Sequence, residues 1–307
     1  MQKILPSAHL FEMFMPITDD EKRMWEVVEQ IPEKKFYRGI ELGMFFQKAY
    51  RDKIRKVVEE NNYQLTSWAT PYLLRNNLNL SSLDTELRKK SVDYAVEMAK
   101  MLPEMGTTNY GIPSGDYLGD EQKEEQKKAL FDSLTTIHEE ISKYEGMHMV
   151  LEPLDRYAYK KQLIGPMPEV AEWFQGLQKV NPNIYIHWDS AHEVLGKMDL
   201  IESLDLAQPY LAQFHLCNCI GDEGHPCFGD LHMDVGRAPE FKTWGFLTPE
   251  VGAKVVKHAA EYETTPGIKN TYCALEVRSH PGDDLWEKEK MCREFMKATF
   301  DLAGISY

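Results

Sequence analysis

Short apolar runs rich in β-branched and aromatic residues alternate along the chain with longer charged segments. Short apolar runs are typical of buried strands, whereas apolar positions three or four residues apart indicate one face of a helix. We predict strands at residues 4–14, 38–44, 63–69, 107–110, 147–154, 184–189, 211–217 and 271–277. Each run is followed by a segment with helical periodicity. These segments lie at 19–31, 46–61, 83–101, 120–144, 168–180, 199–207, 249–262 and 284–303.

Eight strand–helix units predict a single (β/α)8 TIM barrel of the α/β class, formed by residues 1–307 as one domain. The structural alternative is an open doubly wound sheet. Such a sheet usually has fewer strands and often a glycine-rich phosphate loop after the first one, and the sequence has no G-x-G-x-x-G or Walker A pattern. A long loop is expected after the seventh strand, from Asn218 onward. Since loops after barrel strands form the active-site face, this loop is expected to be functional.

Composition narrows the class of protein. The 307 residues include 35 Lys+Arg and 49 Asp+Glu, giving a net charge of −14, which argues against binding nucleic acid through the overall field. No stretch approaches the roughly 20 apolar residues needed to cross a bilayer, and the N-terminus lacks a signal-peptide pattern. We therefore expect a cytoplasmic protein without membrane partners, and its five cysteines are expected to be reduced. Cys217, Cys219 and Cys227, with His225 nearby, could bind zinc instead, but their spacing matches no standard zinc finger.

Polar side chains end the last four predicted strands. Glu152, Asp189, His215 and Glu276 each close an otherwise apolar run. A buried carboxylate is costly unless it is paired or bound to a metal, and the ends of successive barrel strands meet over one rim. Three carboxylates and one imidazole suit one divalent cation, Mn²⁺ first, with Mg²⁺, Co²⁺ or Zn²⁺ as alternatives. Taken singly, each carboxylate could be a salt-bridge partner and the histidine a core residue.

Two further histidines extend this set. His192 lies three residues after Asp189 and can turn back over the same rim, whereas His232 lies in the long seventh loop. We expect both to contact substrate or support the metal ligands, and His232 could also be a second-metal ligand or a solvated loop residue. His148 and His187 face the barrel interior by strand parity, and we expect both to be core residues.

Aromatic residues at the predicted rim could form the walls of a substrate site, or they could be ordinary barrel packing. They are Phe11, Trp68, Tyr110 and Tyr157. We expect Trp68, Tyr110 and Arg156 to contact a small-molecule substrate. A homo-oligomer is also expected.

Several of these segments together resemble the xylose-isomerase-like barrel superfamily, which includes ketose 3-epimerases, hydroxypyruvate isomerase, inosose dehydratase and endonuclease IV. They are Glu152-Pro-Leu-Asp-Arg-Tyr, Asp189-Ser-Ala-His192, Phe-His215, the Asp-x-His-x-x-Val-Gly segment ending at Gly236, and Leu-Glu276. In the epimerase branch, the resemblance implies that Glu152 and Glu276 bind the metal and act as the acid/base pair. Asp189 and His215 complete the metal site, and His192 contacts substrate. The implied activity is a metal-dependent isomerase or epimerase that acts on a small-molecule sugar or glycoside and moves a proton beside its carbonyl through an enediolate.

The chain departs from the epimerase pattern at two places. Ala158 stands where epimerases usually carry a second glutamate, and Val-Gly-Arg replaces the usual Gly-x-Gly after His232. The segment from His215 to Glu276 is also long for that branch. These departures keep open a lyase of the same superfamily, such as the large subunit of a C-glycoside deglycosidase, which works with a small second subunit on 3-oxo-glycosides.

Two other classes of function are also open. Endonuclease IV resembles the chain at Asp230-x-His232, but its three-zinc site needs histidines where this chain has Trp68 and Tyr110. No histidine occurs between His9 and His138, and the acidic net charge also disfavours DNA. The remaining hypothesis is a metal-stabilised binding protein without activity.

Overall fold

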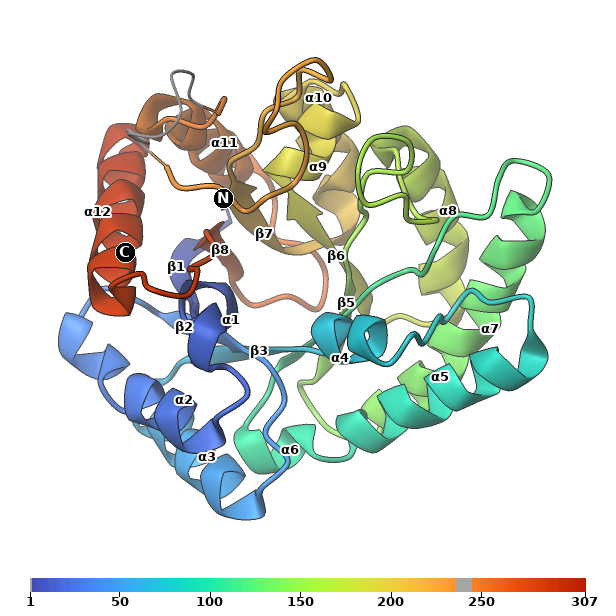
Figure 1. Cartoon of the computed structure of the whole chain (residues 1–307), viewed down its shortest axis with the longest axis horizontal. Helices are drawn as coiled ribbons and strands as arrows, with labels where there is room; N and C mark the ends of the chain where they lie inside the picture. The colour runs from blue at the N-terminus through green and yellow to red at the C-terminus, as the bar shows by residue number, and fades with distance from the viewer. Residues whose placement is uncertain (1, 236–244) are drawn as a thin grey trace.

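The computed structural model describes residues 2–235 and 245–307 of the chain. Within these residues, eight parallel strands pair in sequence order, and β8 pairs with β1 to close a barrel (Figure 1). The strands are β1 (Ile4–His9), β2 (Gly39–Leu42), β3 (Gln64–Trp68), β4 (Asn109–Ile112), β5 (His148–Leu151), β6 (Ile184–Asp189), β7 (Leu211–Cys217) and β8 (Thr271–Glu276). The predicted (β/α)8 barrel is therefore confirmed, and the open sheet is excluded.

Helices form a ring around the strands (Figure 1). They are α1 (Leu10–Met13), α2 (Glu21–Val28), α3 (Lys48–Asn61), α4 (Thr70–Arg75), α5 (Thr85–Ala99), α6 (Leu102–Met105), α7 (Lys123–Ile141), α8 (Met167–Val180), α9 (Ser190–Leu195), α10 (Leu200–Ala207), α11 (Pro249–Glu261) and α12 (Leu285–Ala303). None of the helices that the structure describes has both the length and the apolarity required to span a membrane.

Aspartate side chains begin several of these helices. The carboxylates of Asp20, Asp84, Asp199 and Asp284 each accept hydrogen bonds from two backbone N–H groups in the first turn of α2, α5, α10 and α12. This capping satisfies donors that the helix itself leaves unpaired, which explains why these helices start where they do.

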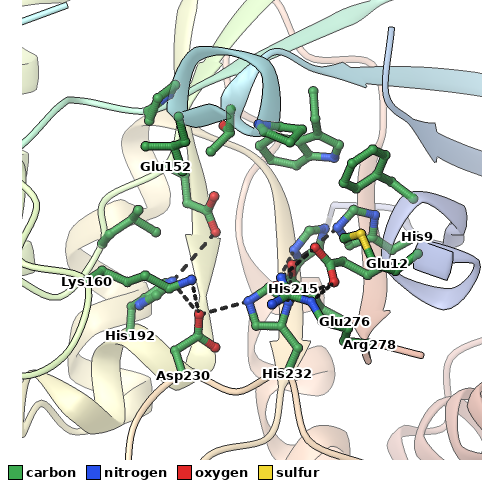
Figure 2. Close-up of a pocket in the computed structure, with 18 of the residues that line it drawn as sticks. His9, Glu12, Glu152, Lys160, His192, His215, Asp230, His232, Glu276 and Arg278 are labelled. Carbon is green, nitrogen blue, oxygen red and sulfur yellow. Dashed lines mark hydrogen bonds and ion pairs between the residues drawn. The ribbon is translucent and has the colours of Figure 1, made fainter. Parts of the chain in front are cut away.

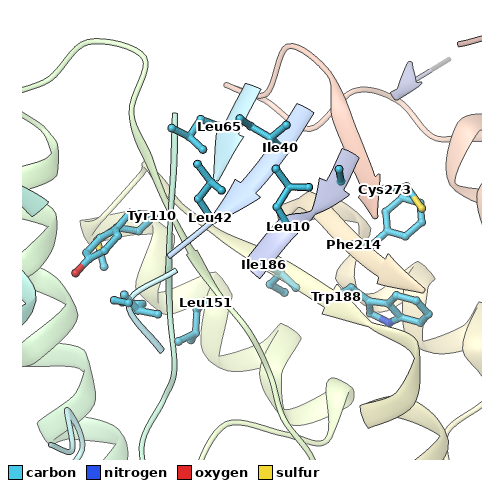
Figure 3. Close-up of a cluster of buried hydrophobic side chains, with 14 of the residues drawn as sticks. Leu10, Ile40, Leu42, Leu65, Tyr110, Leu151, Ile186, Trp188, Phe214 and Cys273 are labelled. Carbon is cyan, nitrogen blue, oxygen red and sulfur yellow. The ribbon is translucent and has the colours of Figure 1, made fainter. Parts of the chain in front are cut away.

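The strands alternate between an outer apolar face and an inner polar face. Side chains such as Ile40, Leu65 and Leu151 are buried in the layer between the strands and the helices (Figure 3). Inside the barrel, the Thr66 hydroxyl and the Asn109 amide both donate to Oε1 of Gln213 on β7, at 2.7 and 2.6 Å. Because β3 and β4 are not neighbours of β7, these side chains meet across the barrel interior. The polar interior continues to the C-terminal ends of the strands, where the candidate functional site lies.

The first predicted strand was too long. β1 ends at His9, and the chain turns at once into α1, where the N–H of Phe14 donates to the carbonyl of Leu10. The apolar run continues past the strand because Phe14 packs edge-on against Trp286 of α12, with ring centroids 5.0 Å apart. Apolar character here reflects helix packing and not strand pairing.

The predicted long loop follows β7 and reaches α11 at Pro249. Residues 236–244 of this loop, including Gly236 of the sequence motif, lie outside the described residues. The preceding segment is joined to the residues that follow β8, because the N–H of Arg278 donates to the carbonyl of His232 at 2.9 Å. The loop thus brings His232 to the rim at which β8 ends.

Candidate active site

A cavity of about 350 Å³ lies at the C-terminal ends of the barrel strands (Figure 2). Its lining includes side chains from both ends of the chain, because β1 and β8 are neighbours in the barrel. The polar residues of the lining include His9, Glu12, Glu152, Lys160, Gln162, His192, His215, Asp230, His232, Glu276 and Arg278. This rim carries the active site in TIM-barrel enzymes, so the cavity is the candidate active site.

The four predicted metal ligands converge beside this cavity. Asp189, His215 and Glu276 come from β6, β7 and β8, and Glu152 directly follows β5. One ligand atom from each of the four lies within 4.8 Å of the others, and all four residues are buried. Three smaller groups of possible ligands overlap this one through His215 or Glu276. The group of four contains the most carboxylates, which are the ligands that hard divalent cations prefer.

The two oxygens of Asp189 have different surroundings. Oδ1 accepts hydrogen bonds from the backbone N–H groups of Ala191 and His192, at 2.7 and 3.2 Å, and so caps α9. Oδ2 is buried and has no hydrogen-bond partner among the described residues. A buried carboxylate oxygen without a partner is unfavourable, and it is explained if an ion binds there.

The carboxylates of the site repel one another. Burial, followed by the negative charge of Glu276, raises the pKa of Glu152 to about 8. Burial also raises the pKa of Asp189 to about 6, although the charge of His192 opposes this change. Burial alone would raise the pKa of Glu276 too, but the imidazoles of His232 and His215 hold it well below its ordinary value. A divalent cation would neutralise this concentration of buried negative charge, so the residues present fit such an ion.

His215 is held by carboxylates on both sides of its ring. Nδ1 lies 3.3 Å from Oε2 of Glu276, and Nε2 lies 2.9 Å from Oε2 of Glu41. Glu41 was missed by the sequence analysis, as was His9, whose ring stacks on His215 at 4.7 Å. The available signal was a charged residue inside the apolar strand Gly39–Leu42, of the same kind that revealed Glu276.

A second group of charged residues surrounds His232 beside the cavity (Figure 2). Its Nε2 lies 2.8 Å from Oδ2 of Asp230, and its Nδ1 lies 3.2 Å from Oε2 of Glu12. Arg278 donates to both oxygens of Glu12 at 2.6 and 2.9 Å, and Lys160 lies 2.8 Å from Asp230. Glu12, Lys160 and Arg278 were not predicted, and Asp230 was noted only as part of the Asp-x-His motif. The cations of this group are already neutralised by carboxylates.

His192 also lines the cavity, as expected. Its Nδ1 lies 3.2 Å from Oδ2 of Asp155, and its Nε2 lies 4.0 Å from Oε1 of Glu152. Asp155 is itself held by backbone N–H groups of Tyr159 and Lys160. The ring of His192 is therefore oriented by a fixed carboxylate, and its Nε2 lies between the carboxylates of Glu152 and Asp230, 4.0 and 3.9 Å away.

The predicted walls divide into two sets. Phe11 and Trp68 line the cavity. Tyr110 does not reach it, because its side chain lies in the outer apolar layer and donates to the carbonyl of Ala95 at 2.9 Å (Figure 3). Tyr157 is 63% exposed and lines a neighbouring pocket instead. Strand parity explains Tyr110, since its neighbour Gly111 occupies the inward position beside Trp68.

Arg156 is also placed away from the cavity. Its Nη1 donates to Glu169 of α8 at 2.6 Å, and its Nε donates to the carbonyl of Leu163 at 3.0 Å. The guanidinium thus ties the loop after β5 to α8, and the structure does not bring it to the predicted ligands.

The remaining histidines and cysteines are placed as follows. His187 lies inside the barrel with its ring centroid 4.0 Å from that of His215, whereas His148 lies at the opposite end of the barrel against Tyr185. All five cysteines are free. Among the described residues, Cys217, Cys219 and Cys227 do not form a group with metal-ligand spacing.

The sequence also matches a known family. The family model described as a xylose isomerase-like TIM barrel matches residues 34–247, so the chain belongs to this family, as the motifs predicted. The matched range contains Glu152, Asp189 and His215 but ends before Glu276. No curated protein matches the chain in sequence.

Solved structures with the same fold include sugar epimerases. D-psicose 3-epimerase from Clostridium cellulolyticum H10, determined with D-tagatose, is 16% identical, with 91% of this chain and 92% of that chain covered and a TM-score of 0.63. A 3-keto-D-glucoside 4-epimerase from E. coli is 12% identical, with 97% and 100% covered and a TM-score of 0.63. The IOLI protein, determined with a binding zinc atom, is 15% identical, with 92% and 94% covered and a TM-score of 0.61. At these identities the comparison shows a shared fold.

Proposed function

We propose that this protein is a divalent-metal-dependent sugar isomerase or epimerase that moves a proton at the carbon beside a carbonyl. The observation that supports this most directly is the convergence of Glu152, Asp189, His215 and Glu276, with ligand atoms within 4.8 Å of one another beside a cavity. Membership of the xylose isomerase-like family and the epimerase neighbours support the same reaction class.

These four residues would hold the cation, and Mn²⁺ is the ion that we expect. When bound, a divalent cation would polarise the substrate carbonyl and stabilise the negative charge that develops during proton removal. Glu152 and Glu276 would exchange the proton with the carbon, one acting as base and the other as acid. The enediolate of the sugar would then be reprotonated at the same or the neighbouring carbon.

The rest of the cavity would orient the sugar. Trp68 and Phe11 offer aromatic surface to the apolar face of a sugar ring, and Met15 and Leu154 add further apolar lining. His192, Lys160 and His232 offer hydrogen-bonding groups to its hydroxyls. The cavity volume of about 350 Å³ suits a small sugar derivative.

The test uses protein stripped with a chelator and reloaded with Mn²⁺. Incubation with ketoses in heavy water, followed by NMR, should show deuterium at the carbon beside the carbonyl and the appearance of an isomer. Glu152→Gln and Glu276→Gln should each lower kcat by at least about 100-fold, as expected for loss of a general acid or base. Tyr110→Phe is the matched control, because its hydroxyl bonds Ala95 outside the cavity.

Full activity in both glutamine variants would overturn the mechanism, and failure to bind any divalent metal would overturn metal dependence. The alternatives are tested with the same protein. Release of an aglycone from a 3-oxo-glycoside, dependent on a co-expressed small subunit, would favour the lyase. Nicking of an abasic duplex would favour the nuclease, and metal binding without turnover of any substrate would favour a binding protein.

A further inference from the structure

Glu41 is a buried carboxylate that does not line the cavity. It belongs to β2, its exposed fraction is 1%, and it lies beneath residues that do line the cavity. Its Oε2 lies 2.9 Å from Nε2 of His215 and 3.0 Å from Nε1 of Trp68. One oxygen therefore contacts both a predicted metal ligand and a wall of the cavity.

The chemistry of these contacts determines which atom carries each proton. Indole Nε1 can only donate, so Glu41 accepts from Trp68. A carboxylate has no proton to offer when ionised, so the short contact with His215 requires a proton on Nε2 of the imidazole. In the neutral imidazole the lone pair is then on Nδ1.

Nδ1 is the nitrogen that faces the other predicted ligands. It lies 3.3 Å from Oε2 of Glu276 and 4.0 Å from Oδ2 of Asp189. The opposite tautomer would direct an N–H toward the cation and a lone pair toward the Glu41 carboxylate. Without a cation, His215 can donate to both Glu276 and Glu41. With a cation at Nδ1, the contact with Glu41 would keep the remaining proton on Nε2, which is the tautomer that can bind a metal.

Stability alone does not account for a carboxylate in this place. His215 is the ion-pair partner of Glu41 among the described residues, and both side chains are almost fully buried. Burying a charged pair costs desolvation that the pair often does not recover, so well-packed apolar residues at both positions 41 and 215 would stabilise the barrel about as well.

We infer that Glu41 is a positioning residue that fixes the tautomer and orientation of His215, so that Nδ1 faces the divalent cation, and that holds the Trp68 indole at the cavity wall. This inference rests on the proposed function, because it assigns a role toward the proposed metal. Carboxylates in this position behind a metal-binding histidine typically contribute about 10–100-fold to metal affinity.

The first test needs no variant. In protein loaded with Zn²⁺, which is diamagnetic, long-range ¹H–¹⁵N correlation of the His215 ring should show the proton on Nε2 and the metal on Nδ1. A proton on Nδ1 with the metal on Nε2 would overturn the inference directly.

The second test measures Mn²⁺ affinity by titration calorimetry. Glu41→Gln should weaken binding by about 10–100-fold. Glu289→Gln is the matched control, since Glu289 is equally buried but bonds Tyr37 and Arg293 on the far side of the barrel wall, and it should leave metal affinity unchanged. Trp68→Phe removes the indole donor and part of the aromatic surface but leaves the Glu41–His215 contact, so it should change metal affinity by less than about threefold while weakening substrate binding.

The two proposals fail in different ways. If the unaltered protein binds no divalent metal, the proposed function fails. If it binds metal and Glu41→Gln binds equally tightly, the positioning role fails while the proposed function stands. If Glu41→Gln does not fold by circular dichroism, the tautomer measurement on the unaltered protein decides.

Discussion

Gly111 on β4 leaves the space that the indole of Trp68 on β3 occupies. The two residues are paired in register, and a Cβ built on Gly111 would overlap the six-membered ring of Trp68. Glycine is required here because of a close approach between neighbouring inward positions. The wall of the candidate active site thus depends on a residue without a side chain.

Replacing Gly111 with alanine should therefore displace Trp68. We expect a loss of about 1–3 kcal/mol of stability, which is typical of overpacking a rigid site, and a shift of the Trp68 indole N–H resonance. Urea unfolding and NMR check these outcomes. Gly176→Ala in α8 is the control, because no atom lies near its added Cβ and alanine should stabilise the helix by about 0.5–1 kcal/mol. Equal stability of the two variants would contradict the prediction.

Asp189→Asn should separate helix capping from metal binding. Asparagine caps helices as well as aspartate does, so stability without metal should change by less than about 1 kcal/mol. The variant should lose most of the metal-induced stabilisation, which is about 2.7 kcal/mol for a ligand present at 100 times its Kd. Thermal unfolding with chelator and with Mn²⁺ measures both quantities. Asp199→Asn, at the start of α10, is the matched control and should keep the full response to Mn²⁺.

Glu169 should contribute to stability at neutral pH but not in acid. Burial would raise its pKa, but hydrogen bonds from Arg156 and Lys127 lower it from 4.5 to about 2. The contribution is therefore fully present above pH 4.5 and is lost as the pH falls toward 2. Glu169→Gln should cost about 2 kcal/mol at pH 7, after allowance for partial exposure, and almost nothing near pH 2. Urea unfolding across this range checks it, and a constant difference at all pH values would refute it.

Glu193 should have the opposite dependence on pH. Burial raises the pKa of its carboxyl from 4.5 to about 7, although a hydrogen bond with Ser203 opposes this change. Between these values the unfolded chain loses the proton while the folded chain keeps it, so stability falls as the pH rises. Glu193→Gln does not titrate, and its stability relative to the unaltered protein should rise by about 2–3 kcal/mol between pH 4.5 and 8. Denaturant unfolding at both pH values measures this change. The same stability difference between variant and unaltered protein at both pH values would contradict the prediction.

Much of the fold could be predicted from the sequence because strands and helices differ in the spacing of apolar residues. All eight predicted runs overlap strands of one barrel, and four of these strands end at Leu42, Trp68, Asp189 and Glu276, within two residues of the predicted ends. The boundary at His9 was misjudged, because apolar character continues into α1 for packing against α12. The pattern of apolar residues along the chain indicates which residues are buried, but it does not indicate which element packs against them.

The sequence by itself determined the barrel, the family, and the four side chains that converge from β5 to β8. The physical reason is that the C-terminal ends of parallel barrel strands meet at one rim, so polar residues at these ends lie close together. Only the tertiary structure decided the rest. Closure of β8 on β1 brings Glu12 and Arg278 together, Glu41 reaches His215 across the barrel interior, and Tyr110 turns outward while Gly111 faces Trp68. These relationships join residues far apart in the chain, or depend on the inward or outward parity of one position. Spacing along the sequence carries neither kind of information.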